Sequence, residues 1–252
     1  GKCVANESHI SGKSGWWGPN INIHRSPFGG RNFECYSADP FLTGRIASEI
    51  TSVAVNRGVA IQMKNFGIYN QEKNREGLCV FVNEQAIREI YLKGFQMAVT
   101  QGKVTGFMGS YNRIGLIDSA ASYPLNTEIL RNEWGFRGSI LSEMTHSGNA
   151  SINFKCYENV TARVLSGQNC QLDSVGFHGQ TISVWDEDQT WSGGTGAPVY
   201  ERDGVKHISF TWWNAVREAV KGHMYMFANS ILADKEVALV DHNFTKTVEA
   251  CE

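Results

Sequence analysis

The sequence has no long hydrophobic run, although 42% of its 252 residues are hydrophobic. No stretch approaches the roughly 18 apolar residues that a helix needs to span a bilayer. The first residues, Gly-Lys-Cys-Val-Ala-Asn-Glu, also lack the apolar core of a signal peptide. We therefore expect a soluble chain without a membrane segment, and the sequence leaves its compartment open.

The chain also has no large excess of positive or negative charge. The 23 Lys and Arg residues nearly balance the 25 Asp and Glu residues, and no run of like charges occurs. This balance argues against nucleic acid or an anionic membrane surface as a partner. A neutral, polar ligand such as a small carbohydrate fits better. The seven tryptophans could supply flat platforms for sugar rings, or they could simply pack in the core.

Motifs for metals and nucleotide cofactors are absent. The six cysteines are scattered without a Cys-x-x-Cys pair, and the seven histidines are dispersed. There is no Gly-x-Gly-x-x-Gly, no phosphate-binding loop and no Gly-x-Ser-x-Gly elbow. We expect no metal and no cofactor, and we interpret the cysteines as mostly buried thiols.

Short β-rich runs alternate with longer amphipathic segments, which is typical of βα units around a parallel sheet. In two segments, residues 41–57 and 83–101, apolar residues recur at helical spacing and a glycine follows the end, which predicts two helices. A third helix is predicted before the Gly-Phe-Arg-Gly turn. The predicted strands are residues 20–24, 59–64, 104–110 and 139–142, and the predicted helices are 41–57, 83–101, 123–134 and 211–230.

The pattern is weaker in the second half of the chain. Residues 159–166 and 168–172 repeat it faintly, and the tail from residue 231 could add a helix or strand. Residues 174–209 are rich in Gly, Ser, Thr and Asp, which predicts a long loop or a small insertion. We interpret residues 1–252 as one domain.

Four stretches carry a recognisable pattern. Residues 15–34 contain Arg31 directly after two glycines, near the end of the stretch. Residues 63–75 begin Met-Lys-Asn-Phe and end with the spacing Gln-Glu-x-x-Arg. Residues 108–112 read Met-Gly-Ser-Tyr-Asn, and residues 142–144 read Ser-Glu-Met. Together these stretches closely resemble the catalytic barrel of glycoside hydrolase family 3, the β-glucosidase family.

The resemblance implies a TIM-type (β/α)8 barrel. Only five or six βα units are visible, so the barrel is expected to be incomplete or irregular, with a first strand upstream of residue 1. Catalytic groups in such barrels lie at the carboxyl ends of strands. Four candidates follow predicted strands in this way: Arg31, Lys64, Tyr111 and Glu143.

Glu143 is the candidate nucleophile. The resemblance implies a retaining mechanism, in which one carboxylate attacks the anomeric carbon and a second carboxyl group acts as acid and base. Where the family has aspartate, this chain has glutamate, so the carboxylate is one methylene longer. The alternative is a glutamate at the end of a strand that only binds sugar or pairs with Arg137.

The resemblance also names sugar-binding residues. Lys64 and Asn65 stand where the family has a Lys-His pair that grips sugar hydroxyls, and the planar fork of Arg31 suits vicinal hydroxyls or a carboxylate. Lys64 could instead be a solvated lysine, and the aromatic ring of Tyr111 could pack in the core. The substrate-binding candidates are Arg31, Lys64, Asn65, Tyr111, Met108 and Glu72.

Four positions depart from the family pattern: Ala38, Asn65, Glu143 and Asn169. Ala38 replaces a glutamate, which would leave the preceding arginine or a loop donor without a partner. No acid/base carboxylate or histidine can be assigned, and the resemblance implies that another domain, a mobile loop or another subunit supplies it.

Three hypotheses therefore stand. The first is a β-glucosidase-like hydrolase of terminal β-linked glucosides, with Glu143 as its nucleophile. The second is a catalytically impaired barrel that only binds carbohydrate. The third is an isolated or engineered barrel fragment, which would bind no sugar at all.

Overall fold

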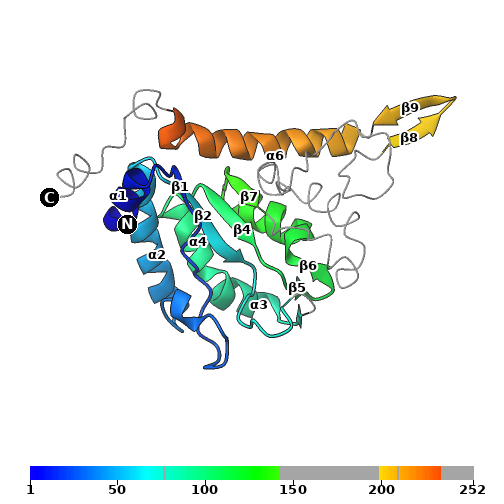
Figure 1. Ribbon diagram of the computed structural model, residues 1–252. Helices are drawn as coiled ribbons and strands as arrows, with labels where there is room; N and C mark the ends of the chain where they lie inside the picture. Colours follow the sequence, from blue (N-terminus) through cyan, green and yellow to red (C-terminus); the bar gives the residue numbers. More distant parts are fainter. Residues whose placement is uncertain (76–77, 142–198, 209, 234–252) are drawn as a thin grey trace.

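A computed structural model describes residues 1–75, 78–141, 199–208 and 210–233 of the chain (Figure 1). Its centre is a four-stranded parallel sheet in the order β1-β2-β4-β7, formed by β1 (Gly15–Trp16), β2 (Ala60–Phe66), β4 (Gly106–Gly109) and β7 (Ser139–Leu141). Strands that follow one another around the sheet in chain order are typical of a (β/α)8 barrel. Over the described residues, this sheet is open and does not close on itself.

Helices alternate with these strands. The α-helices are α1 (Lys2–Ile10), α2 (Pro40–Asn56), α3 (Glu84–Ala86), α4 (Lys93–Thr100) and α6 (Phe210–Ala228). The π-helices are η2 (Ile87–Tyr91) and η4 (Pro124–Glu133), and the 3-10 helices are η1 (Asn32–Glu34), η3 (Ser119–Ala121) and η6 (Ile231–Ala233). Small sheets add β3 (Cys79–Val80) with β5 (Arg113–Ile114) and β6 (Ile117–Asp118), and β8 (Val199–Arg202) with β9 (Val205–Ile208).

An aromatic cluster joins the sheet to the helices behind it. Phe66 on β2 and Phe107 on β4 are fully buried, and their ring centroids lie 5.0 Å apart. Phe95 on α4 meets Phe66 edge-on at 5.4 Å, and Phe136 lies 5.0 Å from Phe107. Such offset and edge-on contacts add to the burial of apolar surface. They fix the two central strands, whose carboxyl ends carry the candidate site.

The strand predicted at residues 20–24 is wrong. Only Asn20 forms a parallel bridge, with Lys64, and the strand beside β2 is the earlier β1. The buried side chain of Asn22 takes the place of further backbone pairing, because its Nδ2 donates to the carbonyl of Asn65 (3.1 Å) and its Oδ1 accepts from the backbone N–H of Asn65 (3.0 Å). This amide side chain satisfies the backbone of β2 where a neighbouring strand would otherwise do so.

Helix α2 confirms the helix predicted at residues 41–57, and the side chain of Asp39 caps its first turn. The apolar spacing that predicted it does not mark the buried face, since Leu42 is 49% exposed. Small residues form that face because α4 approaches closely. A Cβ on Gly44 would lie 2.6 Å from Met97 Sδ and 3.2 Å from Gly94 Cα.

Helix α6 confirms the helix predicted at residues 211–230 and runs past the amino-terminal ends of β7, β4 and β2 (Figure 1). Gly222 permits this approach, because a Cβ there would lie 2.6 Å from the carbonyl oxygen of Gly138, just before β7. About one turn further along the helix, the side chain of Gln62 on β2 donates to Met226 Sδ at 3.0 Å.

Most of the other predicted helices and strands are confirmed, and one predicted loop contains a hairpin. Strands 59–64, 104–110 and 139–142 and helices 83–101 and 123–134 are confirmed with small shifts at their ends, although the last two helices are partly or wholly π-helical. Within the predicted loop at 174–209, residues 199–208 form a hairpin that turns at Asp203 and Gly204, both with positive φ. The Asp-Gly pair is a standard signal for such a turn. The predictions at 159–166, 168–172 and 174–198 lie outside the described residues.

Three further observations concern the described part of the chain. No helix in it is long and apolar enough to cross a membrane, and no group of three or more His, Cys, Asp or Glu side chains in it could hold a metal ion. Cys3 is exposed, and Cys35 and Cys79 are partly buried, so the interpretation of the cysteines as mostly buried thiols is wrong for these three.

Candidate active site

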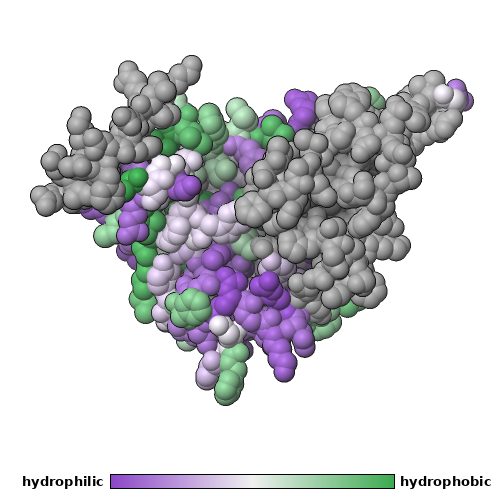
Figure 2. Space-filling view, viewed as in Figure 1, coloured by the Kyte–Doolittle hydropathy of each residue, from purple (hydrophilic) through white to green (hydrophobic). Residues whose placement is uncertain are grey.

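The loops that follow β1, β2 and β4 bring charged residues together at the carboxyl end of the sheet. Figure 2 shows hydrophilic residues gathered at this end, on the lower face of the molecule. Arg31 comes from the loop after β1, Lys64 from the end of β2 and Tyr111 from the loop after β4. The structure therefore brings together side chains that the sequence placed after three separate strands.

Glu34 links two of the predicted sugar-binding residues. Arg31 grips it with two parallel hydrogen bonds, Nε to Oε1 at 2.8 Å and Nη2 to Oε2 at 2.9 Å. Lys64 Nζ reaches the same carboxylate, 3.1 Å from Oε2. About a fifth of each side chain is exposed. The two-point pairing fixes the orientation of the Arg31 guanidinium, and the single contact with Oε2 holds the Lys64 ammonium group beside it.

Glu72 forms the second carboxylate of the network. Its Oε1 accepts from Arg31 Nη1 (3.1 Å) and from the hydroxyl of Tyr69 (2.6 Å), and its Oε2 accepts from Arg75 Nη1 (3.2 Å). Arg31 thus keeps two carboxylate partners, so the expectation that the change at Ala38 leaves this arginine unpartnered is wrong. Glu72 is committed to holding these side chains in place.

Aromatic rings line the network. The guanidinium of Arg75 stacks over Tyr111, with Cζ 4.3 Å from the ring centroid, and the ring of Tyr69 lies 6.3 Å from that of Tyr111. Arg31 lies over Tyr69 at 5.9 Å. A cation near a ring face is held by the negative potential of that face. Tyr111 is therefore part of the charged cluster, and it does not pack in the main hydrophobic core.

The network perturbs the protonation of its members. The hydrogen bonds from Arg31, together with the contribution of Lys64, lower the pKa of Glu34 from 4.5 to about 2 against the opposing effect of burial. Burial, together with the hydrogen bond to Glu72, raises the pKa of Tyr69 to about 12. At neutral pH the site therefore holds an ionised Glu34 and a neutral Tyr69, whose hydroxyl donates a hydrogen bond to Glu72.

Met108 and Asn65 lie deeper than the charged cluster. Met108 on β4 is 5% exposed, and the indole of Trp17 donates to its sulfur at 2.9 Å. Asn65 is fully buried, and neither atom of its side-chain amide has a hydrogen-bond partner in the described part of the chain. An unpaired buried amide costs free energy until a donor or acceptor reaches it. Asn65 is therefore a buried amide next to Lys64 in the chain, with hydrogen-bonding capacity that no described residue uses.

Glu143, the predicted nucleophile, lies outside the described residues, as does Asn169. The structure describes the strand that leads to Glu143, because β7 ends at Leu141 and pairs in parallel with β4. Because β4 and β7 run parallel, their carboxyl ends lie at the same edge of the sheet. The position of the Glu143 carboxylate remains a prediction.

Sequence reasoning missed Glu34 and Tyr69 as members of the site, and it missed the contact of Trp17 with Met108. Glu34 lies three residues after Arg31, and Tyr69 lies three residues before Glu72, so each is within reach of its partner through a short turn. An acidic residue so near a predicted binding arginine was the available signal. No sequence signal pointed to the pairing of Trp17 with Met108, which are 91 residues apart.

The pKa of Glu34 predicts how pH acts on stability. Because this pKa is depressed in the folded protein, the carboxylate stabilises the fold fully above about pH 4.5, and the contribution is lost as pH falls toward about 2. Urea unfolding of the wild type and of Glu34→Gln should differ by about 1.5–3 kcal/mol at pH 7, and the difference should shrink steadily below pH 4.5. A difference that does not change with pH would contradict the ionic role of Glu34.

Gly30 makes the approach of Arg31 to Glu72 feasible. Its φ is +90°, and a Cβ there would lie 2.9 Å from Glu72 Cβ. We expect Gly30→Ala to lower the free energy of unfolding by about 1–3 kcal/mol and to weaken sugar binding, because both the backbone and Glu72 must shift. Gly115→Ala is a matched control, since that residue also has positive φ but no atom lies within 4 Å of the position that its Cβ would take. Equal effects on sugar binding would show that backbone strain alone is responsible.

Similarity to known proteins covers the stretch that contains this site. The family model described as the glycosyl hydrolase family 3 N terminal domain matches residues 1–175. A β-glucosidase of Ruminococcus albus is 44% identical over 126 residues, which is 50% of this chain and 13% of that protein. An exo-alpha-(1->6)-L-arabinopyranosidase of Bifidobacterium longum is 40% identical over 138 residues, 54% of this chain and 18% of that protein.

The fold agrees with these relatives. β-Glucosidase 3B from Thermotoga neapolitana, solved in complex with glucose, superposes with a TM-score of 0.73 at 25% identity, over 99% of this chain and 32% of that protein. The architecture is thus that of a TIM-type α/β barrel domain, as the sequence predicted. This chain spans less than a fifth of the length of the curated relatives that it matches. Since the family model covers more than half of its residues, the chain belongs to glycosyl hydrolase family 3.

Proposed function

We propose that this chain contributes the sugar-binding barrel of a β-glucosidase-like enzyme that hydrolyses terminal β-linked glucosides. The observation that carries the proposal is the network in which Glu34 holds Arg31 and Lys64 side by side at the carboxyl end of the sheet. Two oriented cations are suited to several hydroxyl groups of one sugar ring. The β-glucosidases among the relatives support this choice of substrate.

Within this proposal, Arg31 and Lys64 donate to sugar hydroxyls, and Tyr111 supplies an aromatic wall. Glu72 acts indirectly, because it fixes Arg31, Arg75 and Tyr69. Pre-oriented donors favour binding because less side-chain freedom is lost when the ligand arrives. Met108 and Asn65 complete the floor, and a ligand hydroxyl that reached Asn65 would satisfy an amide that has no partner among the described residues.

The proposed chemistry is a double displacement with retention. Glu143 attacks the anomeric carbon, the bond to the leaving-group oxygen breaks, and that oxygen receives a proton from a separate acid. Water then releases the glycosyl group from Glu143, and the same acid, now a base, accepts the proton of that water. Because this chain covers a small share of its relatives, we propose that a second domain or subunit supplies the acid/base group.

Hydrolysis of an activated aryl β-glucoside by the full-length protein tests the proposal. An aryl group with low basicity needs little acid assistance, so turnover reports mainly on the nucleophile and the sugar pocket. The aryl α-L-arabinopyranoside should be run in parallel, because a relative is named for that activity. Glucose binding without turnover of either substrate would support the alternative of a barrel that only binds carbohydrate. Absence of both binding and turnover would overturn the proposal.

A further inference from the structure

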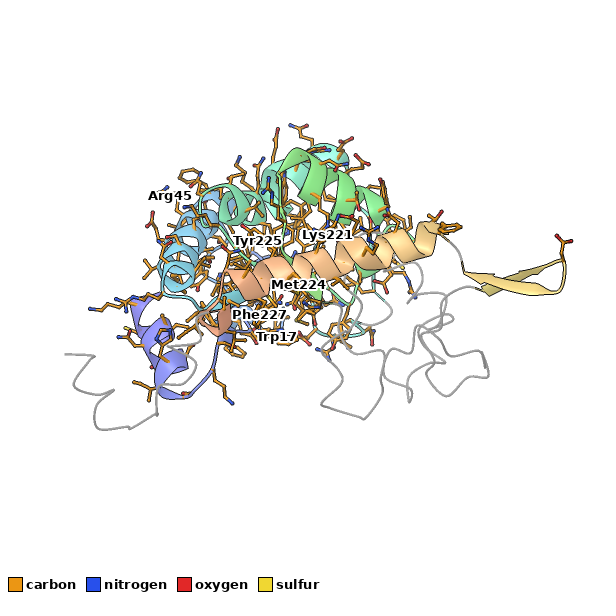
Figure 3. All side chains as sticks on the ribbon, turned by 90° about the horizontal axis from the view of Figure 1, so that it is seen from above. Trp17, Arg45, Lys221, Met224, Tyr225 and Phe227 are labelled. Carbon is orange, nitrogen blue, oxygen red and sulfur yellow. The ribbon has the colours of Figure 1, made fainter. Side chains whose placement is uncertain are left out.

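The loop that leaves β1 runs beside the carboxyl-terminal part of β2 before it reaches Arg31. Its first residue, Trp17, is labelled in Figure 3. Further along the loop, the carbonyl oxygen of Pro19 accepts from the backbone N–H of Lys64 at 3.0 Å. The N–H of Ile21 donates to the carbonyl oxygen of Lys64 at 2.9 Å. The loop therefore binds Lys64 at both its backbone N–H and its backbone carbonyl group.

The side chain of Asn22 extends this contact to the residues that follow Lys64. Its Nδ2 donates to the carbonyl oxygens of Asn65 (3.1 Å) and Gly67 (3.3 Å), and its Oδ1 accepts from the N–H of Asn65 (3.0 Å). Because Asn22 is only 3% exposed, water competes little for these bonds. The amide of Asn22 thus holds the peptide group that directly follows Lys64.

The charged end of Lys64 is held by a later part of the same loop. Its Nζ lies 3.1 Å from Oε2 of Glu34, which belongs to η1. Between Asn22 and Glu34 the loop is braced by His24, whose Nε2 donates to the carbonyl oxygen of Asn32 at 2.9 Å. One loop therefore fixes both the backbone and the ammonium group of Lys64. A shift of either end would move the ammonium group relative to Arg31.

We propose that Asn22 is a positioning residue for sugar binding, which acts through Lys64 and does not touch the sugar. This inference rests on the proposed function, in which Lys64 donates to a sugar hydroxyl. A donor that is already in place loses little freedom when the ligand arrives. Because hydrogen bonds weaken steeply when distance and angle are poor, a small shift of the Lys64 backbone would weaken the bond to that hydroxyl.

Calorimetric titration of the full-length protein with glucose tests this role without requiring turnover. Asn22→Leu keeps the branched shape of the side chain but removes its three bonds to β2. We expect the Kd for glucose to rise by about tenfold. Asn22→Ala, which adds no apolar bulk, is a second variant and should raise the Kd in the same way. Circular dichroism and urea unfolding show which variants are folded.

Thr105→Val is the matched control. Thr105 is 1% exposed, and its Oγ1 accepts from the N–H of Ile61 (2.8 Å) and donates to the carbonyl oxygen of Ile61 (3.3 Å). It thus makes the same kind of side-chain contact with the backbone of β2, but near the amino-terminal end of the strand. Thr105→Val should lower the free energy of unfolding while leaving the Kd for glucose unchanged.

A double-mutant cycle with Lys64→Met tests whether Asn22 acts through Lys64. Lys64→Met removes the ammonium group but keeps an unbranched side chain. Asn22→Leu should raise the Kd about tenfold when Lys64 is present and less than twofold in the Lys64→Met background. Glucose is highly soluble, so the weaker binding of these variants can be followed by NMR at high glucose concentration.

Two results would overturn this inference alone. The first is wild-type affinity for glucose in a folded Asn22 variant. The second is an equal effect of Asn22→Leu with and without the Lys64 ammonium group, which would mean that Asn22 only supports the fold. Failure of the proposed function would be visible in the wild type itself, as absence of both glucose binding and aryl β-glucoside hydrolysis. That result would refute the positioning role as well.

Discussion

Replacing Glu143 with glutamine is expected to abolish hydrolysis of an aryl β-glucoside by the full-length protein while leaving glucose binding intact. Glutamine has the shape of glutamate but cannot form the covalent glycosyl intermediate. We expect kcat to fall by roughly 10⁴-fold, equivalent to about 5.4 kcal/mol of transition-state stabilisation. Steady-state kinetics and glucose titration on the same preparations measure both parts of this expectation.

Glu143→Asp is the matched control. It keeps the carboxylate but shortens the side chain by one methylene, which restores the residue that the family has at this position. Because a shift of about 1 Å can change a rate by on the order of a hundredfold, the aspartate variant should differ from the wild type in kcat yet remain far more active than the glutamine variant. Equal activity of wild type and Glu143→Gln would remove Glu143 from the mechanism.

Arg31→Lys is expected to have the second-largest effect, through binding. Lysine preserves the charge but cannot form the two parallel bonds to Glu34 while also reaching Glu72. The ammonium would shift, and Lys64 would lose the fixed carboxylate arrangement that orients it. We expect KM for the aryl β-glucoside to rise by about tenfold to a hundredfold, with a smaller fall in kcat.

Arg45→Lys controls for the general effect of exchanging arginine for lysine. Arg45 lies on the exposed surface of α2, where it contacts Glu49 and Gln101. Its replacement should leave both kinetic constants unchanged, because surface pairs contribute little. If Arg31→Lys left KM unchanged as well, the two-point grip on Glu34 would have no part in sugar binding.

The fold was largely predictable because hydrophobic periodicity and helix-stop signals agree along the first half of the chain. Prediction failed where a side chain, and not a neighbouring strand, forms hydrogen bonds with the backbone of a strand. It also failed where two helices pack unusually close together. The amide of Asn22 bonds to the backbone of β2, so residues 20–24 need no strand geometry. The contact between α2 and α4 admits only small residues at positions such as Gly44, so the larger Leu42 is exposed.

The candidate site was predictable in part, for a related reason. Lys64 lies near the end of β2 and Tyr111 just after β4, and parallel strands bring such residues together. Arg31 reaches the same edge of the sheet from the long loop after β1. Their partners could not be assigned from spacing alone, because whether Glu34 bonds to Lys64 depends on how the loop after β1 folds back over β2. The burial of Asn65 likewise reflects packing around β2, which a motif does not reveal.

We propose above all that Glu143 performs the nucleophilic attack on a sugar held by Arg31 and Lys64. Mass spectrometry of the full-length protein treated with an activated 2-fluoro-glucoside tests it most directly, because the fluorine slows release of the covalent intermediate. We predict a single glycosyl adduct on the peptide that contains Glu143, and its absence from Glu143→Gln. An adduct on another carboxylate, or no adduct on a protein that still binds glucose, would contradict the claim.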